Sequence, residues 1–464
     1  MSRRREAAVA FVLTFAIAAA LLWLGPAGAD TAAHVYQRWL YMQHGFVSWD
    51  NYWYGGRYVF VTYSWLYYPV AAVVGIKLLA ALSLAVASAA FALFVDYRPA
   101  VLAFAVVWGA YAISGAYPFM LGFAFALLAL ATRRLWLFTP LAVLAWAASP
   151  LALLLLAVGV VGLRRRRESG LTLALIAAQI VLAHLYHGRG HFPFRWQEAL
   201  AALVFAAGGA LLARGRRVGG IFLAYLGLVL LSVVFQSQLG ENAARLRFLA
   251  LPLALLAVRG RRLLIAVPLV ALCAAYNTTP LAWSFSKGLH ERADSAAYWR
   301  PAIAFLRAHD DPNYRVNALD TVGHWEAVYL PEAGFPITRG WYRQDDFPEN
   351  AILYDRRDLN ERTYLEWLHA RAVRFVLVPR DRLDYSSAGE PALAARLPRV
   401  ATAGRVTIYE VPNATPLVPG AQVLRLTHDA LVVRCPHAGT WHVNVRGHET
   451  FFAPRTGVFT IGFA

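Results

Sequence analysis

Residues 7–34 read AAVAFVLTFAIAAALLWLGPAGADTAAH, an apolar run that ends at Leu24 and is followed by an acid at Asp30. A helix needs about 20 apolar residues to cross the hydrocarbon core of a bilayer, and this run is close to that length. Arg3–Arg5 before the run and Pro26–Ala29 after it also match the ends of a cleaved signal peptide. We favour a retained membrane-spanning helix, because the apolar part of a signal peptide is shorter, about 7–15 residues.

The same apolar character continues over the first two thirds of the chain. Of the 464 residues, 59% are hydrophobic and 15% are charged, whereas soluble domains average about 45–50% and about 25%. Further apolar runs lie at 67–95, 100–115, 117–131, 135–148, 149–163, 171–186, 198–213, 218–235, 249–258 and 263–276. This composition excludes a soluble enzyme and a nucleic-acid module. It predicts a polytopic α-helical membrane protein with about 11 transmembrane helices in residues 1–276.

The net charge of +17 is distributed unevenly and indicates topology. Residues 1–276 contain 23 Lys and Arg residues and seven acids, whereas residues 277–464 contain 21 and 20. The basic clusters between apolar runs lie at 3–5, 133–134, 164–167, 214–217 and 259–262. Under the positive-inside rule they are cytoplasmic, which makes 25–66, 187–197 and 236–248 outward loops. We therefore predict a plasma-membrane protein with a cytoplasmic N-terminus and an extracytoplasmic C-terminal region.

The C-terminal region has a different pattern. Helix-like stretches at 302–309 and 361–371 alternate with strand-like stretches at 314–319 and 373–378, which predicts an extracytoplasmic α/β domain over 277–404. After residue 404 only short β-type runs remain, at 405–411, 421–426, 431–434, 441–445 and 458–463. They are separated by Pro, Gly and Asn, and they predict a β-sandwich-like domain over 405–464.

Four of the seven acids in residues 1–276 fall on the predicted outer side: Asp30, Asp50, Glu198 and Glu241. A carboxylate beside the bilayer is unfavourable unless it is hydrated or paired, so each is a candidate functional residue. If a helix starts at Asp30, this acid caps it and His34 lies one turn later on the same face. Alternatively, Asp30 is a general base for an acceptor hydroxyl, and His34 orients it or holds a metal. The spacing leaves both interpretations open.

Two outward loops carry further candidates. Loop 25–66 is rich in aromatic residues and includes Trp53, Tyr54 and Arg57; it fits an interfacial aromatic belt, a sugar-binding surface, or both. Loop 236–248 contains Arg245 and Arg247. Arginine binds phosphate oxygens bidentately, so both are candidates for a lipid phosphate, with ordinary headgroup contact as the alternative.

Several short motifs resemble the GT-C superfamily of integral-membrane glycosyltransferases. They are Asp30-x-x-x-His34, Trp53-Tyr54-Gly55-Gly56 and Tyr67-Tyr68-Pro69, and they are similar to uncharacterised bacterial membrane proteins labelled 6-pyruvoyl-tetrahydropterin synthase-related. The segment Arg339–Asp346, followed by Asn350 and Tyr354, resembles actinobacterial members of that group.

This resemblance implies a polyprenyl-phosphate-linked sugar donor, inversion at the anomeric carbon, and a first-loop acid that acts as base or metal ligand. That role falls on Asp30 alone, since Thr31 stands where many members have a second acid. Arg245 and Arg247 correspond by position to the loop in which members hold the donor phosphate. We assign no metal ligand and no cofactor, although a divalent metal is compatible with the family role.

The sequence thus predicts an inverting membrane glycosyltransferase that moves a sugar to a cell-envelope glycan or glycolipid on the extracytoplasmic face. Asp30 is the predicted catalytic residue. The predicted substrate-binding residues are His34, Trp53, Tyr54, Arg57, Glu241, Arg245 and Arg247. One alternative is a non-catalytic protein that binds or presents lipid-linked glycans through Arg339–Asp346. Another is a lipid or polysaccharide transporter, which the scarcity of ionisable residues within the spans disfavours.

Overall fold

The computed structural model describes residues 2–186, 190–235, 237–355 and 357–463, and it divides into two compact units. The first, here called the helical unit, comprises Met1–Thr31, Val61–His187 and His191–Leu289. The second, here called the sheet unit, comprises Ala32–Phe60, Gly188–Gly190 and His290–Ala464. The predicted outward loops 187–197 and 236–248 begin with positions that lie outside the described residues, 187–189 and 236.

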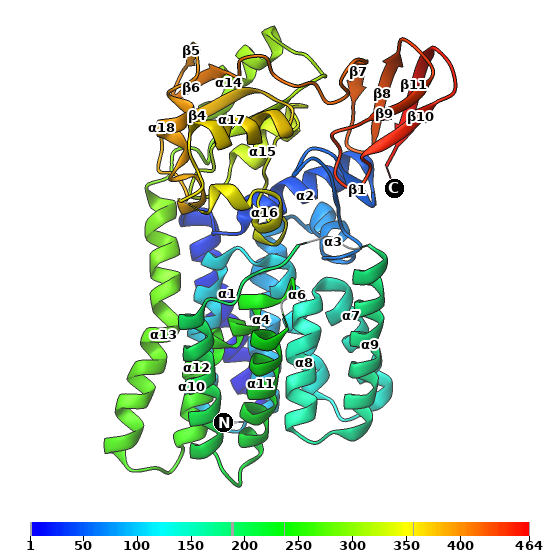
Figure 1. Cartoon of the computed structure of the whole chain (residues 1–464). Coiled ribbons are helices and arrows are strands. Elements are labelled where there is room, and N and C mark those ends of the chain that lie inside the picture. Colours follow the sequence, from blue (N-terminus) through cyan, green and yellow to red (C-terminus); the bar gives the residue numbers. More distant parts are fainter. Residues whose placement is uncertain (1, 187–189, 236, 356, 464) are drawn as a thin grey trace. The chain divides into compact units, whose positions relative to one another are not determined.

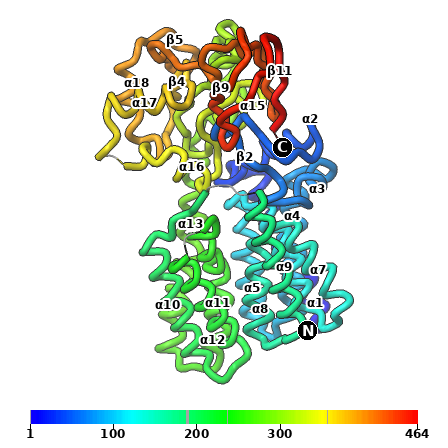
Figure 2. The backbone as a smooth tube through the Cα atoms, turned by 45° about the vertical axis from the view of Figure 1, so that its right-hand side comes forward, coloured from blue at the N-terminus to red at the C-terminus, as the bar shows by residue number. Residues whose placement is uncertain are grey.

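The helical unit consists of helices that run alongside one another (Figures 1 and 2). Its elements are α1 (Arg3–Leu24), α3 (Tyr67–Val74), α4 (Ile76–Phe94), α5 (Arg98–Ala110), η1 (Tyr111–Ser114), α6 (Tyr117–Ala131), α7 (Leu135–Ala148), α8 (Pro150–Gly162), α9 (Arg166–Leu185), α10 (Trp196–Leu212), α11 (Arg217–Val234), η2 (Gly240–Leu249), α12 (Ala250–Val258) and α13 (Leu263–Leu289). Figure 2 shows α10, α11 and α12 as direct neighbours.

Five of these helices, α1, α4, α9, α11 and α13, are long and apolar enough to cross a membrane. Large apolar side chains on them are exposed, for example Val234 at 70% and Leu264 at 89%. Lipid tails solvate such side chains whereas water does not, so the helical unit has the surface of a membrane protein. The remaining apolar helices are shorter, and the predicted count of about 11 spans is not confirmed.

Small residues allow the shorter helices to pack closely. A Cβ atom on Gly122 of α6 would lie 2.8 Å from the Ala152 Cβ of α8 and 3.0 Å from the Ala145 carbonyl oxygen of α7. Because apolar helices in lipid associate through close backbone approach, this contact is typical of membrane helix packing.

The sheet unit combines short helices with four small sheets. Its elements are α2 (Thr31–His44), β1 (Trp49–Asp50), β2 (Arg57–Tyr58), α14 (Ala296–Ala308), β3 (Arg315–Ala318), α15 (Glu326–Glu332), α16 (Arg343–Glu349), η3 (Ala351–Leu353), α17 (Glu361–Ala370), β4 (Val373–Pro379), η4 (Tyr385–Ser387), α18 (Glu390–Ala394), β5 (Arg399–Ala403), β6 (Val406–Glu410), β7 (Gln422–Leu426), β8 (Ala430–Cys435), β9 (Gly439–His442), β10 (Thr450–Ala453) and β11 (Gly457–Gly462).

The largest sheet has the strand order β3-β4-β6-β5, in which only the β3–β4 pair is parallel. Strand β6 lies between β4 and β5, and its residues Val406, Thr407 and Ile408 are all buried, as expected of a central strand. The α/β sheet therefore includes residues beyond the predicted boundary at 404, because a sheet can take up a strand after its last helix.

The aromatic segment 32–60 belongs to the sheet unit. The backbone N–H of Asn51 donates to the His428 carbonyl at 2.7 Å, and that of Arg446 donates to the Gly55 carbonyl at 2.9 Å. Trp49 packs in the same apolar core as Val433 and Trp441 of the β-rich C-terminal part. This segment is thus a structural part of the sheet unit and not a free loop between two helices.

Candidate functional site

Asp30 lies between α1 and α2, where its backbone is fastened to η1. The N–H groups of Ala29 and Asp30 donate to the carbonyls of Ile113 and Ser114 at 3.2 and 3.0 Å. Two glycines make this approach possible. A Cβ on Gly28 would lie 2.7 Å from the Gly115 nitrogen, and a Cβ on Gly115, whose φ is +70°, would lie 2.8 Å from the Asp30 nitrogen. Only glycine combines this φ with this closeness.

The Asp30 carboxylate contacts Arg245 of η2, with 3.5 Å between Oδ2 and Nη2. The Arg245 guanidinium is oriented by three further contacts. Nε donates to Asn242 Oδ1 at 3.1 Å, Nη1 donates to the Tyr111 hydroxyl at 3.4 Å, and the group lies 5.7 Å from the Phe119 ring centroid. The two side chains are 16% and 23% exposed, so the pair is mostly buried but reachable.

Burial raises the pKa of Asp30 to about 6, against the opposing effect of Arg245, which lowers it. A carboxylate with such a pKa is still mainly ionised at neutral pH, but it is a stronger base than an exposed aspartate. Asp30 therefore has the protonation behaviour expected of a general base.

Thr31 takes the place of a second acid next to Asp30, and its hydroxyl is hydrogen-bonded to the Tyr117 hydroxyl at 2.9 Å. Among the described residues, the one cluster with three potential metal ligands lies elsewhere, in the sheet unit. The ion-pair partner that the described structure gives the Asp30 carboxylate is thus the Arg245 guanidinium.

Three other arginines of the helical unit pair with acids among the described residues, and one of these pairs, Arg3 with Asp96 at 3.3 Å, is exposed and outside the predicted site. Arg247 Nη1 donates to Glu198 Oε2 at 2.5 Å. Glu241 accepts from Arg195 Nε and Nη2 at 2.6 and 2.7 Å. A 3₁₀-helix has three residues per turn, so Arg245 and Arg247 of η2 project in different directions. Of the predicted site residues in this unit, the structure brings Asp30 and Arg245 together, while Glu241 and Arg247 have separate partners.

The remaining predicted residues lie in the sheet unit. His34 is buried in α2. Trp53 Nε1 donates to the Ala327 carbonyl at 2.9 Å, and the Tyr54 hydroxyl donates to the Tyr342 carbonyl at 2.9 Å. Arg57 Nε donates to Asp345 Oδ2 at 3.1 Å. These contacts join segment 32–60 to the C-terminal part of the unit.

Sequence analysis did not anticipate a buried ionic network in the sheet unit. Arg339 pairs with Asp320 at 2.9 Å, with Asp346 at 2.5 Å and with Glu390 at 3.3 Å, and all four side chains are at most 3% exposed. Segment 339–346 is therefore not the exposed surface that the glycan-presenting alternative requires. The two arginines and two acids of this segment could have indicated an ionic network from the sequence. That these side chains are buried could not be predicted, because it depends on the fold.

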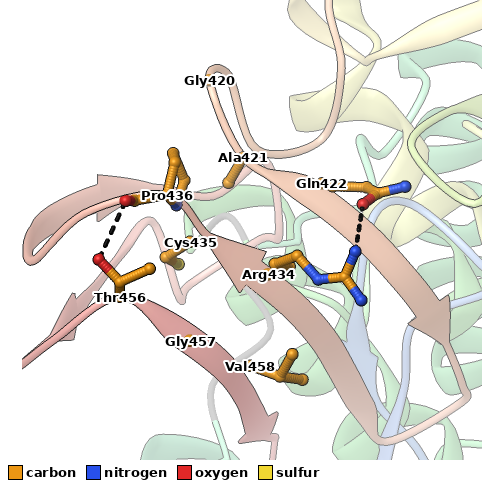
Figure 3. Close-up of a pocket in the computed structure, with 9 residues that line it drawn as sticks. All are labelled: Gly420, Ala421, Gln422, Arg434, Cys435, Pro436, Thr456, Gly457 and Val458. Atoms are coloured by element: carbon orange, nitrogen blue, oxygen red, sulfur yellow. Dashed lines mark hydrogen bonds between the residues drawn. The ribbon is translucent and has the colours of Figure 1, made fainter.

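The β-rich C-terminal part contains a pocket of about 410 Å³. Its polar side chains mostly bond to one another or to the backbone (Figure 3): Arg434 Nη1 donates to Gln422 Oε1 at 3.3 Å, and the Thr456 hydroxyl donates to the Pro436 carbonyl at 3.0 Å. The pocket is lined by no acid and no histidine. The thiol of Cys435 also lines it, and burial raises the pKa of this thiol.

No protein-family model and no curated protein matches this chain. Among solved structures, it is similar to the arabinofuranosyltransferase AftD from Mycobacteria, with 17% identity and a TM-score of 0.45, over 91% of this chain and 41% of that chain. A variant of AftD gives 17% identity and a TM-score of 0.46, over 89% of this chain and 42% of that one. The oligosaccharyltransferase of Archaeoglobus fulgidus gives 12% identity and a TM-score of 0.43, over 80% of this chain and 69% of that one. This chain thus spans about two fifths of the AftD chain, and likenesses of this strength assign it neither a family nor an activity.

Proposed function

We propose that this chain is an inverting membrane glycosyltransferase that moves a sugar from a polyprenyl-phosphate donor to a cell-envelope glycan or glycolipid. The observation that carries the proposal is the contact between Asp30 and Arg245. This contact brings a carboxylate of raised pKa next to a fixed guanidinium. Both groups are mostly buried in an apolar helical unit. The sequence resemblance of the first-loop motif supplies the reaction class.

Asp30 is the general base of the proposed reaction. An acceptor hydroxyl replaces Arg245 as the partner of one carboxylate oxygen and gives its proton to Asp30 as its oxygen attacks the anomeric carbon. The new C–O bond forms while the bond between the anomeric carbon and the phosphate oxygen breaks. Because this is a single displacement, the configuration at the anomeric carbon inverts.

Arg245 stabilises the leaving group. Polyprenyl phosphate departs with an additional negative charge, and a guanidinium remains fully charged at any working pH. The bonds from Arg245 to Asn242 and Tyr111 hold the guanidinium in place before the reaction, so little reorganisation is needed as charge develops. Glu241, Arg247 and the sheet-unit residues His34, Trp53, Tyr54 and Arg57 stay predicted substrate-binding residues.

The topology of the proposal follows from the basic clusters. They support a cytoplasmic N-terminus, which puts Asp30 at the extracytoplasmic end of α1 in the plasma membrane. There it meets a donor whose sugar faces the cell envelope, while the apolar surfaces of the helices solvate the polyprenyl chain.

The test uses purified full-length chain, wild type beside Asp30→Asn and Arg245→Gln, with Arg259→Gln, an arginine of the helical unit outside the predicted site, as a control. Each is incubated with a panel of polyprenyl-phosphate sugars and cell-envelope extract, and released polyprenyl phosphate is measured by mass spectrometry. We expect release by the wild type and a loss of about 10²–10⁴-fold in Asp30→Asn, the usual contribution of a general base.

A wild-type rate in Asp30→Asn and Arg245→Gln together would contradict the proposal. A folded wild type that releases nothing but retains a lipid-linked glycan would favour the non-catalytic alternative.

A further inference from the structure

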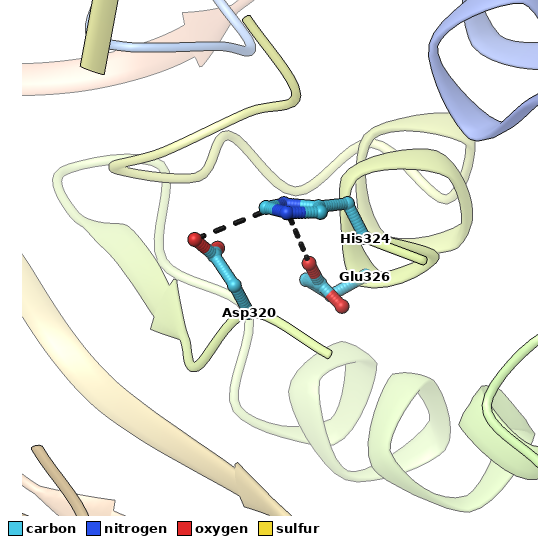
Figure 4. A group of neighbouring side chains, drawn as sticks. All are labelled: Asp320, His324 and Glu326. Atoms are coloured by element: carbon cyan, nitrogen blue, oxygen red, sulfur yellow. Dashed lines mark ion pairs between the residues drawn. The ribbon is translucent and has the colours of Figure 1, made fainter. Parts of the chain in front are cut away.

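Three buried side chains of the sheet unit converge at the carboxyl end of the parallel pair β3–β4. Asp320 comes two residues after β3, His324 follows, and Glu326 begins α15. Figure 4 shows the three side chains pointing toward one another. They are 1%, 4% and 1% exposed, and one donor atom of each lies within 4.8 Å of the other two. Ligand sites often occur at such edges, because loops from neighbouring parallel strands meet there.

Two atoms of this group have no hydrogen-bond partner in the described part of the chain: Nδ1 of His324 and Oε1 of Glu326. Nδ1 lies 3.7 Å from Asp320 Oδ2 and 3.7 Å from Glu326 Oε1, which is too long for hydrogen bonds. The second oxygen of Glu326 accepts from the Thr321 N–H and hydroxyl at 3.1 and 2.8 Å, so the free oxygen is held toward His324. Buried polar atoms rarely lack a partner, and these two face one common point.

The spacing fits two ligands of one metal ion. Nitrogen and oxygen ligands bind Zn²⁺ at about 2.0–2.2 Å, and at angles of about 110–120° such ligands are ~3.3–3.8 Å apart. Both distances from His324 Nδ1, 3.7 Å each, fall in this interval. The backbone of His324 adopts φ of +56°, which is uncommon for a residue other than glycine and turns the ring toward both acids.

The charges of the surrounding buried side chains also favour a cation at this group. Among the described residues, four buried acids, Asp320, Asp346, Asp384 and Glu390, pair with the guanidinium groups of Arg339 and Arg343, whereas the buried Glu326 has no arginine partner, so the acids outnumber the cations.

We propose that Asp320, His324 and Glu326 bind a divalent metal ion of the Zn²⁺ or Mn²⁺ type, which stabilises the β3–β4 edge of the sheet unit. One imidazole nitrogen with two carboxylates suits these ions better than Ca²⁺ or Mg²⁺, which prefer oxygen ligands alone. Because all three side chains are buried, the ion has a structural role and takes no part in the transfer reaction proposed for Asp30.

Metal binding requires two adjustments nearby. Asp320 Oδ2 lies 2.9 Å from Arg339 Nη2 and accepts from the Ser386 hydroxyl at 2.9 Å, so Asp320 gives up these contacts or binds the ion through Oδ1. The second adjustment is at His324. Arg343 Nη2 lies 3.1 Å from His324 Nε2, and a guanidinium only donates, so the ring proton is on Nδ1 without the metal. The ion displaces this proton, the ring carries its proton on Nε2, and Arg343 gives up that contact. It keeps its bonds to Asp384 at 2.6 Å and to the Tyr354 hydroxyl at 3.0 Å.

The test is metal loading of the purified full-length chain. The protein is treated with chelator, dialysed, and titrated with Zn²⁺, followed by elemental analysis and thermal unfolding; Mg²⁺ and Ca²⁺ serve as competitor controls. We expect about one Zn²⁺ per wild-type chain, and a rise of roughly 5 °C in the unfolding temperature of the sheet unit at saturating metal.

His324→Gln and Glu326→Gln should bind no Zn²⁺ and show no such rise. Glu390→Gln is the matched control, because it removes a buried acid of the same network that is not a ligand, and it should keep the metal. A folded wild type that binds no Zn²⁺, or a folded His324→Gln variant that still binds it, would overturn the proposal.

A second measurement does not depend on any variant being folded. Co²⁺ bound to the wild type should give the visible absorption of a site with nitrogen and oxygen ligands, and Zn²⁺ should abolish it by displacement. A Co²⁺ spectrum identical to that of the hydrated ion would equally overturn the proposal.

Discussion

Replacing Arg245 with glutamine should change how the reaction depends on pH, because Arg245 does two things. In the proposed mechanism it stabilises the leaving phosphate, and it also lowers the pKa of Asp30, which burial raises to about 6. A general base must be ionised, so the wild-type rate should fall as the pH drops through about 6. Without the guanidinium the Asp30 pKa rises, and this fall should begin at a higher pH.

The distance between the two groups sets the size of the shift. Opposite unit charges 3.5 Å apart attract by about 4–5 kcal/mol at an effective dielectric constant of ~20. At 1.36 kcal/mol per unit this corresponds to at most about 3.5 pKa units. Since both side chains are partly exposed, we expect the Asp30 pKa to rise by about one to two units in Arg245→Gln. The acidic limb of its pH profile, the range in which the rate falls as the pH drops, should then lie at about pH 7–8.

Two separate losses of rate should then be visible in the variant. Loss of leaving-group stabilisation should lower kcat about 10²–10³-fold at every pH. Protonation of Asp30 should add a further factor of about 2–10 at pH 7 and almost none at pH 9, following the shift derived above. The ratio of wild-type to variant rate should therefore decrease as the pH rises.

The measurement is polyprenyl-phosphate release between pH 5 and 9 by the wild type, Arg245→Gln and Arg247→Gln. Arg247 pairs with Glu198, so its variant should keep the limb near pH 6. Infrared difference spectra of the protonated carboxyl band, assigned with Asp30→Asn, follow the same titration without turnover. The reasoning is refuted if the Arg245→Gln profile parallels that of the wild type, or if Arg247→Gln shifts the limb equally.

Three further substitutions test the structure around the two networks. Gly115→Ala should lower stability by about 2–4 kcal/mol and reduce the transfer rate, because its Cβ would meet the Asp30 nitrogen; Gly260→Ala, also at positive φ but with open space around it, should cost only about 1 kcal/mol in thermal unfolding. Asn277→Leu removes the bonds to the Arg247 carbonyl and from the Leu251 N–H, so unfolding should be easier by about 2–3 kcal/mol, whereas Thr278→Val on the exposed face should have almost no effect. Arg339→Met leaves three buried acids without their partner and should destabilise the sheet unit by about 3–5 kcal/mol in denaturant titrations; Arg362→Met, in an exposed pair with Glu366, should change it by less than about 0.5 kcal/mol.

Hydropathy located the helices well, but it placed the end of α13 too early. The apolar run ends at residue 276, whereas α13 continues to Leu289. Polar residues lower the hydropathy without breaking the helix, because the hydroxyls of Thr278 and Thr279 bond back to the carbonyls of Ala274 and Ala275. Asn277 uses its side chain to hold the η2–α12 junction. A hydropathy value describes which solvent a side chain prefers. It does not include local hydrogen bonds of this kind, so it cannot predict where such a helix ends.

For the candidate site too, the sequence predicts individual residues but not the contacts between them. Asp30 was predicted because a carboxylate beside the bilayer is unfavourable unless it is hydrated or paired, and Arg245 because arginine binds phosphate oxygens bidentately. Their contact depends on η1, which fastens the Asp30 backbone and supplies Tyr111 to Arg245. No spacing in the sequence shows that these three segments meet. Likewise, Asp320, His324 and Glu326 are close in sequence but follow no familiar metal motif, and they converge only through the left-handed turn at His324.

The arginine pairs of Asp30, Glu198 and Glu241 in the helical unit differ in a way that singles out Asp30. Arg247–Glu198 and Arg195–Glu241 are short contacts of 2.5 and 2.6 Å, typical of strong charge-assisted hydrogen bonds that satisfy both partners. The Arg245–Asp30 contact is 3.5 Å, although its side chains are about as buried as those of Arg247 and Glu198. Arg245 takes its closer contacts from Asn242 and Tyr111 instead. A carboxylate whose cationic neighbour is held slightly away can accept a hydroxyl proton without first losing a strong ion pair, and this is why we assign the base to Asp30 and not to Glu198 or Glu241.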